Sequence, residues 1–242
     1  MTASGTPRGS LYLVPVALGE RTPWAHFLPA QAQAVAAGLR HFVVETARAA
    51  RAHLKQLDYP HPLRETDIRE LPVEAADAAL DALLAPALAG ADLGLLSDAG
   101  CPAVADPGAR LVARAHALGI RVVPLVGPSS ILLGLMGSGL NGQSFAFHGY
   151  LPVADGERDA ALRALEDESR KLGRTQIFIE TPYRNERMFD ALLRTLKPET
   201  RLCVACELNT ADECLLTRSV REWRKAARPA LARRPALFLL LA

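Results

Sequence analysis

The first half of the chain alternates short apolar runs of strand length with longer segments that place apolar residues at helical spacing. The runs that predict strands are Leu11–Val14, Phe42–Val44, Gly94–Leu96 and Arg121–Leu125. The segments that predict helices are Trp24–Ala37, Ala47–Leu57, Val73–Leu88 and Ala109–Leu118. Regular alternation of strand and helix predicts an α/β domain with a mostly parallel sheet and helical crossovers.

The pattern changes at 126–130, Val-Gly-Pro-Ser-Ser, where a strand ends in a turn and a serine can cap a helix that begins at Ile131. We therefore expect two α/β domains, residues 1–126 and 127–242. Hairpin-like and crossover connections are mixed in the second domain, which predicts a mixed sheet. Its expected strands are Phe145–Tyr150, Thr175–Glu180, Leu202–Cys206, Cys214–Thr217 and Ala236–Leu241, and its expected helices are Gly156–Leu172, Asn185–Leu196 and Val220–Ala227.

Residues 97–108 form the most distinctive loop, Ser-Asp-Ala-Gly-Cys-Pro-Ala-Val-Ala-Asp-Pro-Gly. Connections of this kind usually have about 2–6 residues, and this one follows a strand at the end where open α/β sheets bind ligands. Asp98 comes directly after the strand and is a candidate ligand-binding residue. Asp106 and Pro107 fit the N-cap and first position of the next helix, so we interpret Asp106 as structural.

Four other strand ends carry polar or turn residues: the loop from Pro15, Glu45 with Arg48, Ser129-Ser130, and the segment 180–184, Glu-Thr-Pro-Tyr-Arg. Each has an ordinary explanation as a helix cap or a turn. Together they place carboxylates, hydroxyls and backbone groups at the carboxyl edges of both sheets. This arrangement predicts a cleft for a small ligand with an amino-acid end, a ribose and a positive centre.

The composition is that of an ordinary globular protein, with 50% apolar residues, 22% charged residues and a net charge of +2. No apolar run approaches the roughly 20 residues of a membrane span, and residues 1–10 lack the apolar core of a secretory signal. We therefore expect a cytoplasmic protein without membrane contact. The arginines of 221–228 and 233–234 permit a nucleic-acid-binding face without predicting one.

Two short motifs match known functional motifs in spacing but not in structural context. Cys203 and Cys206 lie in a strand-like run, where residues three apart point to opposite faces, so they predict no metal site. The glycines at 137, 139 and 142 match the spacing of a dinucleotide fingerprint, but they follow a predicted helix, so we interpret them as a helix end.

On its longer motifs the chain resembles the tetrapyrrole methylase superfamily of S-adenosylmethionine-dependent methyltransferases, and within it the 16S ribosomal RNA cytidine 2′-O-methyltransferase branch. The matching stretches are Leu11-Tyr-Leu-Val-Pro15, Ser97-Asp-Ala-Gly-Cys-Pro102, Asp106-Pro-Gly108, Gly119-Ile-Arg-Val-Val-Pro124, Gly127-Pro-Ser129, Phe147-His-Gly-Tyr-Leu-Pro152, Glu180-Thr-Pro-Tyr-Arg184 and Cys206-Glu-Leu208.

The resemblance implies two α/β domains, a homodimer and S-adenosylmethionine bound in the cleft between the domains. Carried over by position, the donor-binding residues would be Pro15, Ser97, Asp98, Gly100, Val104, Ser129, Ser130 and Glu180. The chain departs from the branch at Val44-Glu-Thr-Ala-Arg48, where an Ala-Glu-Asp-Thr-Arg type stretch is typical, and at Gly19-Glu20, where Gly-Asn is typical. It also lacks a C-terminal extension, so it resembles a short paralogue.

Methyl transfer from a sulfonium is mostly a matter of positioning, and a ribose hydroxyl as acceptor gains from a general base. Glu45 is the candidate base, with Arg48 orienting it or holding a phosphate; the alternative is an ion pair at the start of a helix. Three functions stay open: methylation of ribosomal RNA, methylation of a small molecule such as a tetrapyrrole, and binding of the donor without catalysis.

Overall fold

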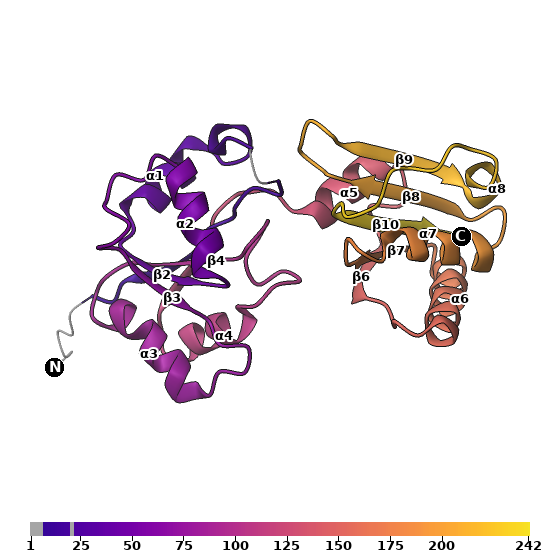
Figure 1. Ribbon diagram of the computed structural model, residues 1–242. Helices are drawn as coiled ribbons and strands as arrows, with labels where there is room; N and C mark the ends of the chain where they lie inside the picture. Colours follow the sequence, from indigo (N-terminus) through magenta and orange to yellow (C-terminus); the bar gives the residue numbers. More distant parts are fainter. Residues whose placement is uncertain (1–6, 20–21) are drawn as a thin grey trace. The chain divides into compact units, whose positions relative to one another are not determined.

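The computed structural model describes residues 7–19 and 22–242, and it divides into two compact units, Met1–Ser129 and Ser130–Ala242 (Figure 1). The sequence predicts this division between residues 126 and 127. Glu20, one of the expected departures from the branch, lies outside the described residues.

The first unit contains a five-stranded parallel sheet in the order β3-β2-β4-β1-β5 among its described residues. Its strands are β1 (Ser10–Leu13), β2 (His41–Val44), β3 (Asp67–Glu70), β4 (Leu93–Leu96) and β5 (Arg121–Pro124). Its helices are the 3-10 turn η1 (Trp24–His26), α1 (Ala30–Gly38), α2 (Ala47–Gln56), α3 (Asp77–Leu88) and α4 (Ala109–Ala117). The central strand β4 is buried along its whole length, as is typical of a parallel strand covered on both faces.

Helices cover both faces of the first sheet, with α1 and α2 on one side and α3 and α4 on the other (Figure 1). Phe42 and Leu54 belong to the core under α1 and α2, while Leu84 and Leu111 belong to the core under α3 and α4. The neighbouring strands β1 and β4 lead into α1 and α4, so their following loops leave the sheet toward opposite faces. Such a topological switch point is where open α/β sheets bind ligands.

The second unit contains a mixed five-stranded sheet in the order β6-β7-β10-β8-β9, in which only β6 and β7 pair in parallel among the described residues. Its strands are β6 (Phe145–Tyr150), β7 (Thr175–Glu180), β8 (Arg201–Cys206), β9 (Cys214–Ser219) and β10 (Ala236–Leu241). Its helices are α5 (Ser130–Ser138), α6 (Asp155–Leu172), α7 (Asn185–Thr195) and α8 (Val220–Trp223). The predicted α/β class, with a parallel first sheet and a mixed second sheet, is confirmed.

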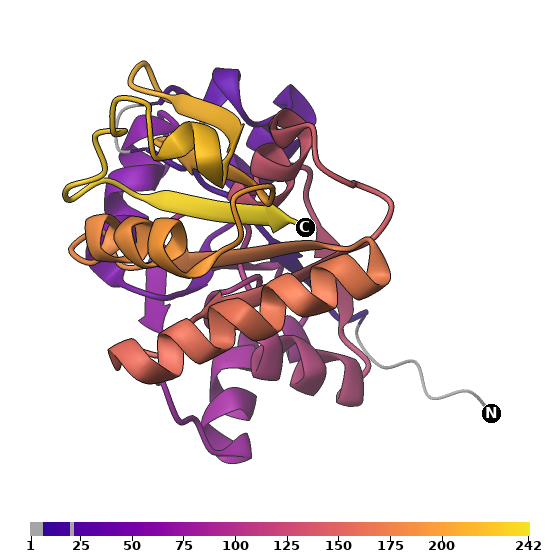
Figure 2. The ribbon, with the colours of Figure 1, turned by 90° about the vertical axis from the view of Figure 1, so that its right-hand side faces the viewer.

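The second sheet is also covered on both faces. The helices α6 and α7 lie side by side over a core that contains Phe178 and Phe238 (Figure 1, Figure 2). The opposite face is covered by α5, which approaches so closely at Gly134 that a Cβ there would lie 2.4 Å from a methyl carbon of Leu237. A glycine in this helix therefore permits the helix to sit on the strands.

The cysteine motif and the glycine motif both have the structural roles that the sequence predicts. Cys203 and Cys206 lie in β8 as buried free thiols, and only Cys206 belongs to the core under α6 and α7, so the two point to opposite faces. Gly139 follows the last residue of α5 with a left-handed φ of 66°, as expected of a glycine that ends a helix.

Four elements differ from the sequence-based prediction: β3, the helix over 24–37, the helix from Val73, and α8, which ends at Trp223 and not at the predicted Ala227. The strand β3 was not predicted, because its sequence is charged, as is typical of an edge strand. The helix predicted over 24–37 is divided, with Pro29 as the N-cap of α1, because proline lacks an N–H for the helix and disfavours helical geometry in the residue before it. The helix predicted from Val73 begins at Asp77, and Val73 is 94% exposed in the preceding loop.

Within the described residues, every helix is too short or too polar to span a lipid bilayer.

Candidate functional site

At the carboxyl edge of the first sheet, hydrogen bonds join the segments that follow neighbouring strands. The end of β3 contacts the start of α2, because the Ala47 N–H donates to Glu70 Oε1 over 2.7 Å. The loop after β1 contacts the loop after β4, because the Val16 N–H donates to the Gly100 carbonyl over 2.9 Å. The edge is therefore one connected polar surface within the first unit.

Asp98 is the centre of this edge. Its Oδ1 accepts hydrogen bonds from the Thr46 N–H at 3.2 Å and from the Thr46 hydroxyl at 2.9 Å. Its own N–H donates to Glu45 Oε2 at 3.0 Å, and its carbonyl oxygen lies 2.9 Å from His53 Nε2. Asp98 is nevertheless exposed, and no described residue donates to Oδ2. One oxygen of a rigidly held carboxylate is thus available to a ligand.

Thr46 and His53 are parts of the site that sequence reasoning missed. Thr46 is the N-cap of α2, and its hydroxyl accepts the Ala49 N–H at 3.3 Å while it donates to Asp98. His53 is buried on the same helix, and its Nε2 donates to the Asp98 carbonyl, because a carbonyl oxygen can only accept; Nδ1 has no hydrogen-bond partner among the described residues. Thr46 and His53 are about two helical turns apart and therefore share one face of α2, and this spacing is a signal that the sequence contains.

The loop after β4 stores backbone strain. Gly100, Ala103, Ala105 and Gly108 all have left-handed conformations, with φ values of 70°, 66°, 62° and 135°. A non-glycine residue in this region costs about 1–3 kcal/mol and persists only where the surrounding structure imposes it. Such residues cluster at ligand-binding sites, which agrees with the candidate role of this loop.

The loops after β1 and β5 pack tightly against each other and against the loop after β4. A Cβ on Gly127 would lie 2.2 Å from Pro15 Cβ, so the two residues are in direct contact. The Cys101 thiol donates to the Pro128 carbonyl over 3.1 Å. Ser97, at the end of β4, is 2% exposed and donates to a carbonyl of its own loop over 3.2 Å.

The interpretation of Asp106 as a helix N-cap is wrong. The helix α4 begins at Ala109, its N-cap is Gly108, and no side chain caps it. The two left-handed residues Ala105 and Gly108 change the direction of the chain around Asp106, so the Asp-Pro pair does not continue into the helix. Partial burial, together with the carboxylates of Glu45 and Asp98, raises the pKa of Asp106 to about 6, although the Ser97 hydroxyl partly offsets this.

This raised pKa predicts a pH-dependent stability. Below its ordinary pKa of 3.8, Asp106 is protonated in both the folded and the unfolded chain, and the favourable contribution of the neutral form is lost as pH rises through about 6. We expect Asp106→Asn to raise the free energy of unfolding at about pH 7.5 by about 1–2 kcal/mol, a range that allows for solvent screening of a half-exposed group. Urea denaturation across about pH 4–8 measures this difference, which should vanish at the acid end.

Asp81→Asn is the control of opposite sign. The hydrogen bond from Arg114 to Asp81 lowers the pKa of Asp81, so its ionised form stabilises the fold and this contribution is lost as pH falls. The Asp81 variant should therefore be less stable than the wild type at about pH 7.5. An Asp106→Asn variant that behaves in the same way as the Asp81 variant contradicts the role assigned to Asp106.

The remaining candidates of the first unit lie at the same edge. Glu45 is half-buried and directs Oε2 toward Asp98, while Arg48 is exposed in the first turn of α2. In the described part of the chain, Glu45 and Arg48 form no ion pair, so the structure does not contain the alternative of an ion pair at the helix start. Val104 is 49% exposed in the loop after β4, and Ser129 is the last residue of the unit.

Two candidate residues belong to the second unit. Ser130 is the first residue of α5. Glu180 ends β7 and is 6% exposed; its Oε1 accepts the Thr181 N–H at 2.6 Å and two N–H bonds of the Arg184 guanidinium at 2.9 and 2.6 Å. This oxygen therefore holds the turn that follows β7.

A shallow pocket of about 210 Å³ lies beside Asp106, between the segments 71–75 and 106–110. It is smaller than the roughly 300–1,000 Å³ that is typical of ligand sites, and it does not include Asp98. In the described ranges, no three His, Cys, Asp or Glu side chains lie close enough together to hold a metal ion.

Comparison with known proteins shows which family the chain matches. The model of the family described as Tetrapyrrole (Corrin/Porphyrin) Methylases matches residues 24–222. A Mesorhizobium japonicum protein named ribosomal RNA small subunit methyltransferase I is 40% identical over 139 residues, which cover 57% of this chain and 46% of that protein. A Pseudomonas aeruginosa protein of the same name is 38% identical over 126 residues, which cover 52% of this chain and 43% of that protein. The aligned part spans about half the length of these curated relatives.

Two solved structures share the fold. The crystal structure of the methyltransferase CobJ has a TM-score of 0.61 at 16% identity, and it covers 96% of this chain and 94% of its own. The uroporphyrin-III-C-methyltransferase from Thermus thermophilus has a TM-score of 0.55 at 20% identity, with coverages of 97% and 92%. At these identities the likeness establishes the arrangement of strands and helices.

Proposed function

Since this chain belongs to the tetrapyrrole (corrin/porphyrin) methylase family, we propose that it is an S-adenosylmethionine-dependent methyltransferase that acts on ribosomal RNA. The observation that carries the proposal is the rigidly held Asp98 carboxylate at the β1/β4 switch point of the first sheet. The relatives named ribosomal RNA small subunit methyltransferase I support the choice of acceptor.

The residues of this edge fit the donor. A donor with an ammonium group, ribose hydroxyls and a sulfonium needs carboxylate and backbone oxygens, and Asp98 keeps one carboxylate oxygen without a described partner. When bound, the donor supplies a methyl group on a positively charged sulfur. We assign donor binding to Pro15, Ser97, Asp98, Gly100, Val104 and Ser129 of the first unit, and to Ser130 and Glu180 of the second.

Glu45 is our candidate for the base that accepts the proton of a ribose 2′-hydroxyl. Its Oε2 is fixed by the Asp98 N–H, and no described residue donates to its Oε1, which leaves that oxygen for a proton. Because one carboxylate oxygen is fixed, the other is held in one orientation, and such positioning lowers the entropy cost of proton transfer.

The experiment that tests the proposal measures transfer of labelled methyl groups from S-adenosylmethionine into small ribosomal subunits, naked ribosomal RNA and a small-molecule extract in parallel. We expect label in one of the two RNA samples. Label in the extract alone indicates a small-molecule methyltransferase. Calorimetric binding of the donor without any transfer indicates a binding module, and absence of binding at millimolar donor overturns the whole assignment.

Arg48 provides a prediction about the acceptor. It is exposed and has no ion pair among the described residues, so its guanidinium is free to neutralise a phosphate. We expect Arg48→Ala to weaken RNA binding and to reduce the slope of log affinity against log salt by about 0.7–0.9, the value for one lost phosphate contact. Donor affinity should change little. RNA binding that is insensitive to Arg48 contradicts a phosphate contact at this residue.

We also propose a homodimer that works in the cytoplasm, where ribosomal RNA is found. The support for a dimer is α5, which is apolar around its circumference yet leaves Leu132 and Met136 52% and 79% exposed. These two residues are four apart and so share one face of the helix. Sedimentation equilibrium tests the dimer, and Met136→Lys should shift the protein toward the monomer.

A further inference from the structure

The turn after β7 is held unusually firmly for a surface segment. The Arg184 N–H closes it on the Thr181 carbonyl at 2.9 Å, and Glu180 Oε1 binds both ends of the same turn. The outer side is held as well, because the Arg233 N–H donates to the Pro182 carbonyl at 3.1 Å. Backbone and side-chain bonds thus fix the turn from two directions.

This fixed turn presents an aromatic side chain to solvent. Tyr183 is 83% exposed, although its neighbours on both sides are tied down. A second tyrosine, Tyr150, ends the adjacent parallel strand β6 and is 59% exposed. The bond to the Glu180 carboxylate raises the pKa of the Arg184 guanidinium, and Tyr150 adds to the same shift, which places Tyr150 near Arg184. The carboxyl ends of β6 and β7 therefore display two tyrosines and an arginine at one edge of the second sheet.

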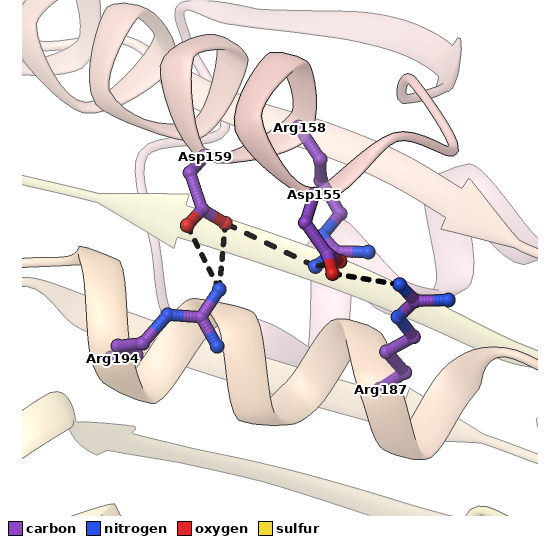
Figure 3. A network of polar contacts seen from close by, with 5 residues as sticks. All are labelled: Asp155, Arg158, Asp159, Arg187 and Arg194. Carbon is purple, nitrogen blue, oxygen red and sulfur yellow. Dashed lines mark hydrogen bonds and ion pairs between the residues drawn. The ribbon is translucent and has the colours of Figure 1, made fainter.

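The arginines around this edge differ in whether a carboxylate binds them. On the neighbouring face of α6 and α7, Asp155 and Asp159 bind the three guanidinium groups of Arg158, Arg187 and Arg194 (Figure 3). Arg233 differs, because it is exposed and has no carboxylate partner among the residues that the structure describes. Its backbone bond to Pro182 places it next to Tyr183.

We infer that Tyr183, Tyr150 and Arg233 form a binding surface for single-stranded RNA, on which bases stack on the tyrosines and Arg233 neutralises a phosphate. Exposed aromatics beside arginine are the combination that recognises unpaired nucleotides, and a rigid turn lowers the entropy cost of binding. The arginines of α6 and α7 are held in ion pairs with Asp155 and Asp159, which offset two of their three charges, whereas Arg233 beside Tyr183 has no carboxylate partner among the described residues. The inference rests on the proposed RNA acceptor and adds a second contact region to it.

The test uses the full chain and a fluorescein-labelled single-stranded oligoribonucleotide of about 10 nucleotides, with fluorescence anisotropy as the readout. We expect Tyr183→Ala to weaken binding about 10-fold, in the range of one lost stacking contact, and Tyr183→Phe to retain it within about twofold, since the ring does the stacking. Arg233→Gln should reduce the salt slope by about 0.7. An RNA duplex of the same sequence should bind less tightly, because its bases are already stacked.

Two matched controls lie elsewhere on the same unit. Phe145 is 42% exposed at the opposite end of β6, and Arg163 is exposed on α6 without an ion pair in the described part of the chain, so Phe145→Ala and Arg163→Gln should bind RNA as the wild type does. Thermal melting confirms that the variants fold.

The outcomes separate this inference from the proposed function. Unchanged RNA affinity in Tyr183→Ala overturns the stacking surface, while methyl transfer to RNA by the same variant leaves the proposed function in place. If the wild-type chain binds no RNA, both the surface and the RNA acceptor are overturned, and calorimetric donor binding then still supports a methyltransferase for another acceptor.

Discussion

Replacing Asp98 by alanine is expected to weaken S-adenosylmethionine binding about 10- to 150-fold. A hydrogen bond to a charged group contributes about 1.5–3 kcal/mol, and each 1.4 kcal/mol corresponds to a tenfold change in affinity. The carboxylate also accepts two bonds from Thr46, so its loss frees the N-cap of α2 from the loop after β4. The effect on donor binding should therefore exceed that of any single change in the neighbouring loops.

Three further variants separate binding from structure. Asp98→Asn keeps an oxygen for Thr46 but removes the charge, so it should bind the donor weakly while it melts near the wild type. Thr46→Val removes the hydroxyl partner and leaves the carboxylate, so it should lose stability more than donor affinity. Asp92→Ala is the matched control, because Asp92 accepts one backbone bond from Ser10 at the opposite end of the sheet. Full donor affinity in Asp98→Asn would falsify the assigned role.

The strands and their ends could be predicted because each is a short apolar run that stops at turn residues. The predicted strands Gly94–Leu96 and Thr175–Glu180 end at the same residues as β4 and β7. Parallel strands present their carboxyl ends at one edge, so the sequence also predicts that Glu45 and Asp98 lie together. The observed bond between Glu45 Oε2 and the Asp98 N–H agrees with that expectation.

The partners that fix Asp98 could not be predicted in the same way. Thr46 lies 52 residues from Asp98 along the chain and His53 lies 45 residues away, and both are on a helix whose rotation about its own axis depends on core packing. Thr46 can be recognised as a helix cap from the sequence, but its second bond across to β4 depends on the order of strands β2 and β4. Local sequence patterns therefore show that Thr46 caps a helix, but they do not show that Thr46 also binds Asp98.

Asp106 shows how local statistics can mislead. Asp followed by Pro is typical of a helix start, but the left-handed Ala105 and Gly108 end that local pattern before α4 begins. Burial and the carboxylates of Glu45 and Asp98 raise the pKa of Asp106; Glu45 follows β2, while Asp98 lies at the start of the same loop as Asp106. The sequence names all three acids, while only the folded chain brings them together.

The close contact between the loops after β1 and β5 leads to the second large effect, in Gly127→Ala. The added Cβ would lie 2.2 Å from Cβ and 2.5 Å from Cγ of Pro15, and a proline ring cannot rotate away. We expect a loss of about 2–3 kcal/mol in the free energy of unfolding, since overpacking of this kind commonly costs about 1–3 kcal/mol and the neighbour is rigid. Urea denaturation measures the loss.

Gly127→Ala should also weaken binding of S-adenosylmethionine, because Pro15 is one of the residues that we assign to donor binding. Gly142→Ala is the matched control, because a Cβ at Gly142 has nothing within 4 Å and its backbone is outside the left-handed region. That variant should keep both its stability and its donor affinity. If Gly127→Ala loses stability but binds S-adenosylmethionine as tightly as the wild type does, then the contact between Pro15 and Gly127 supports the fold alone, and Pro15 does not belong to the donor site.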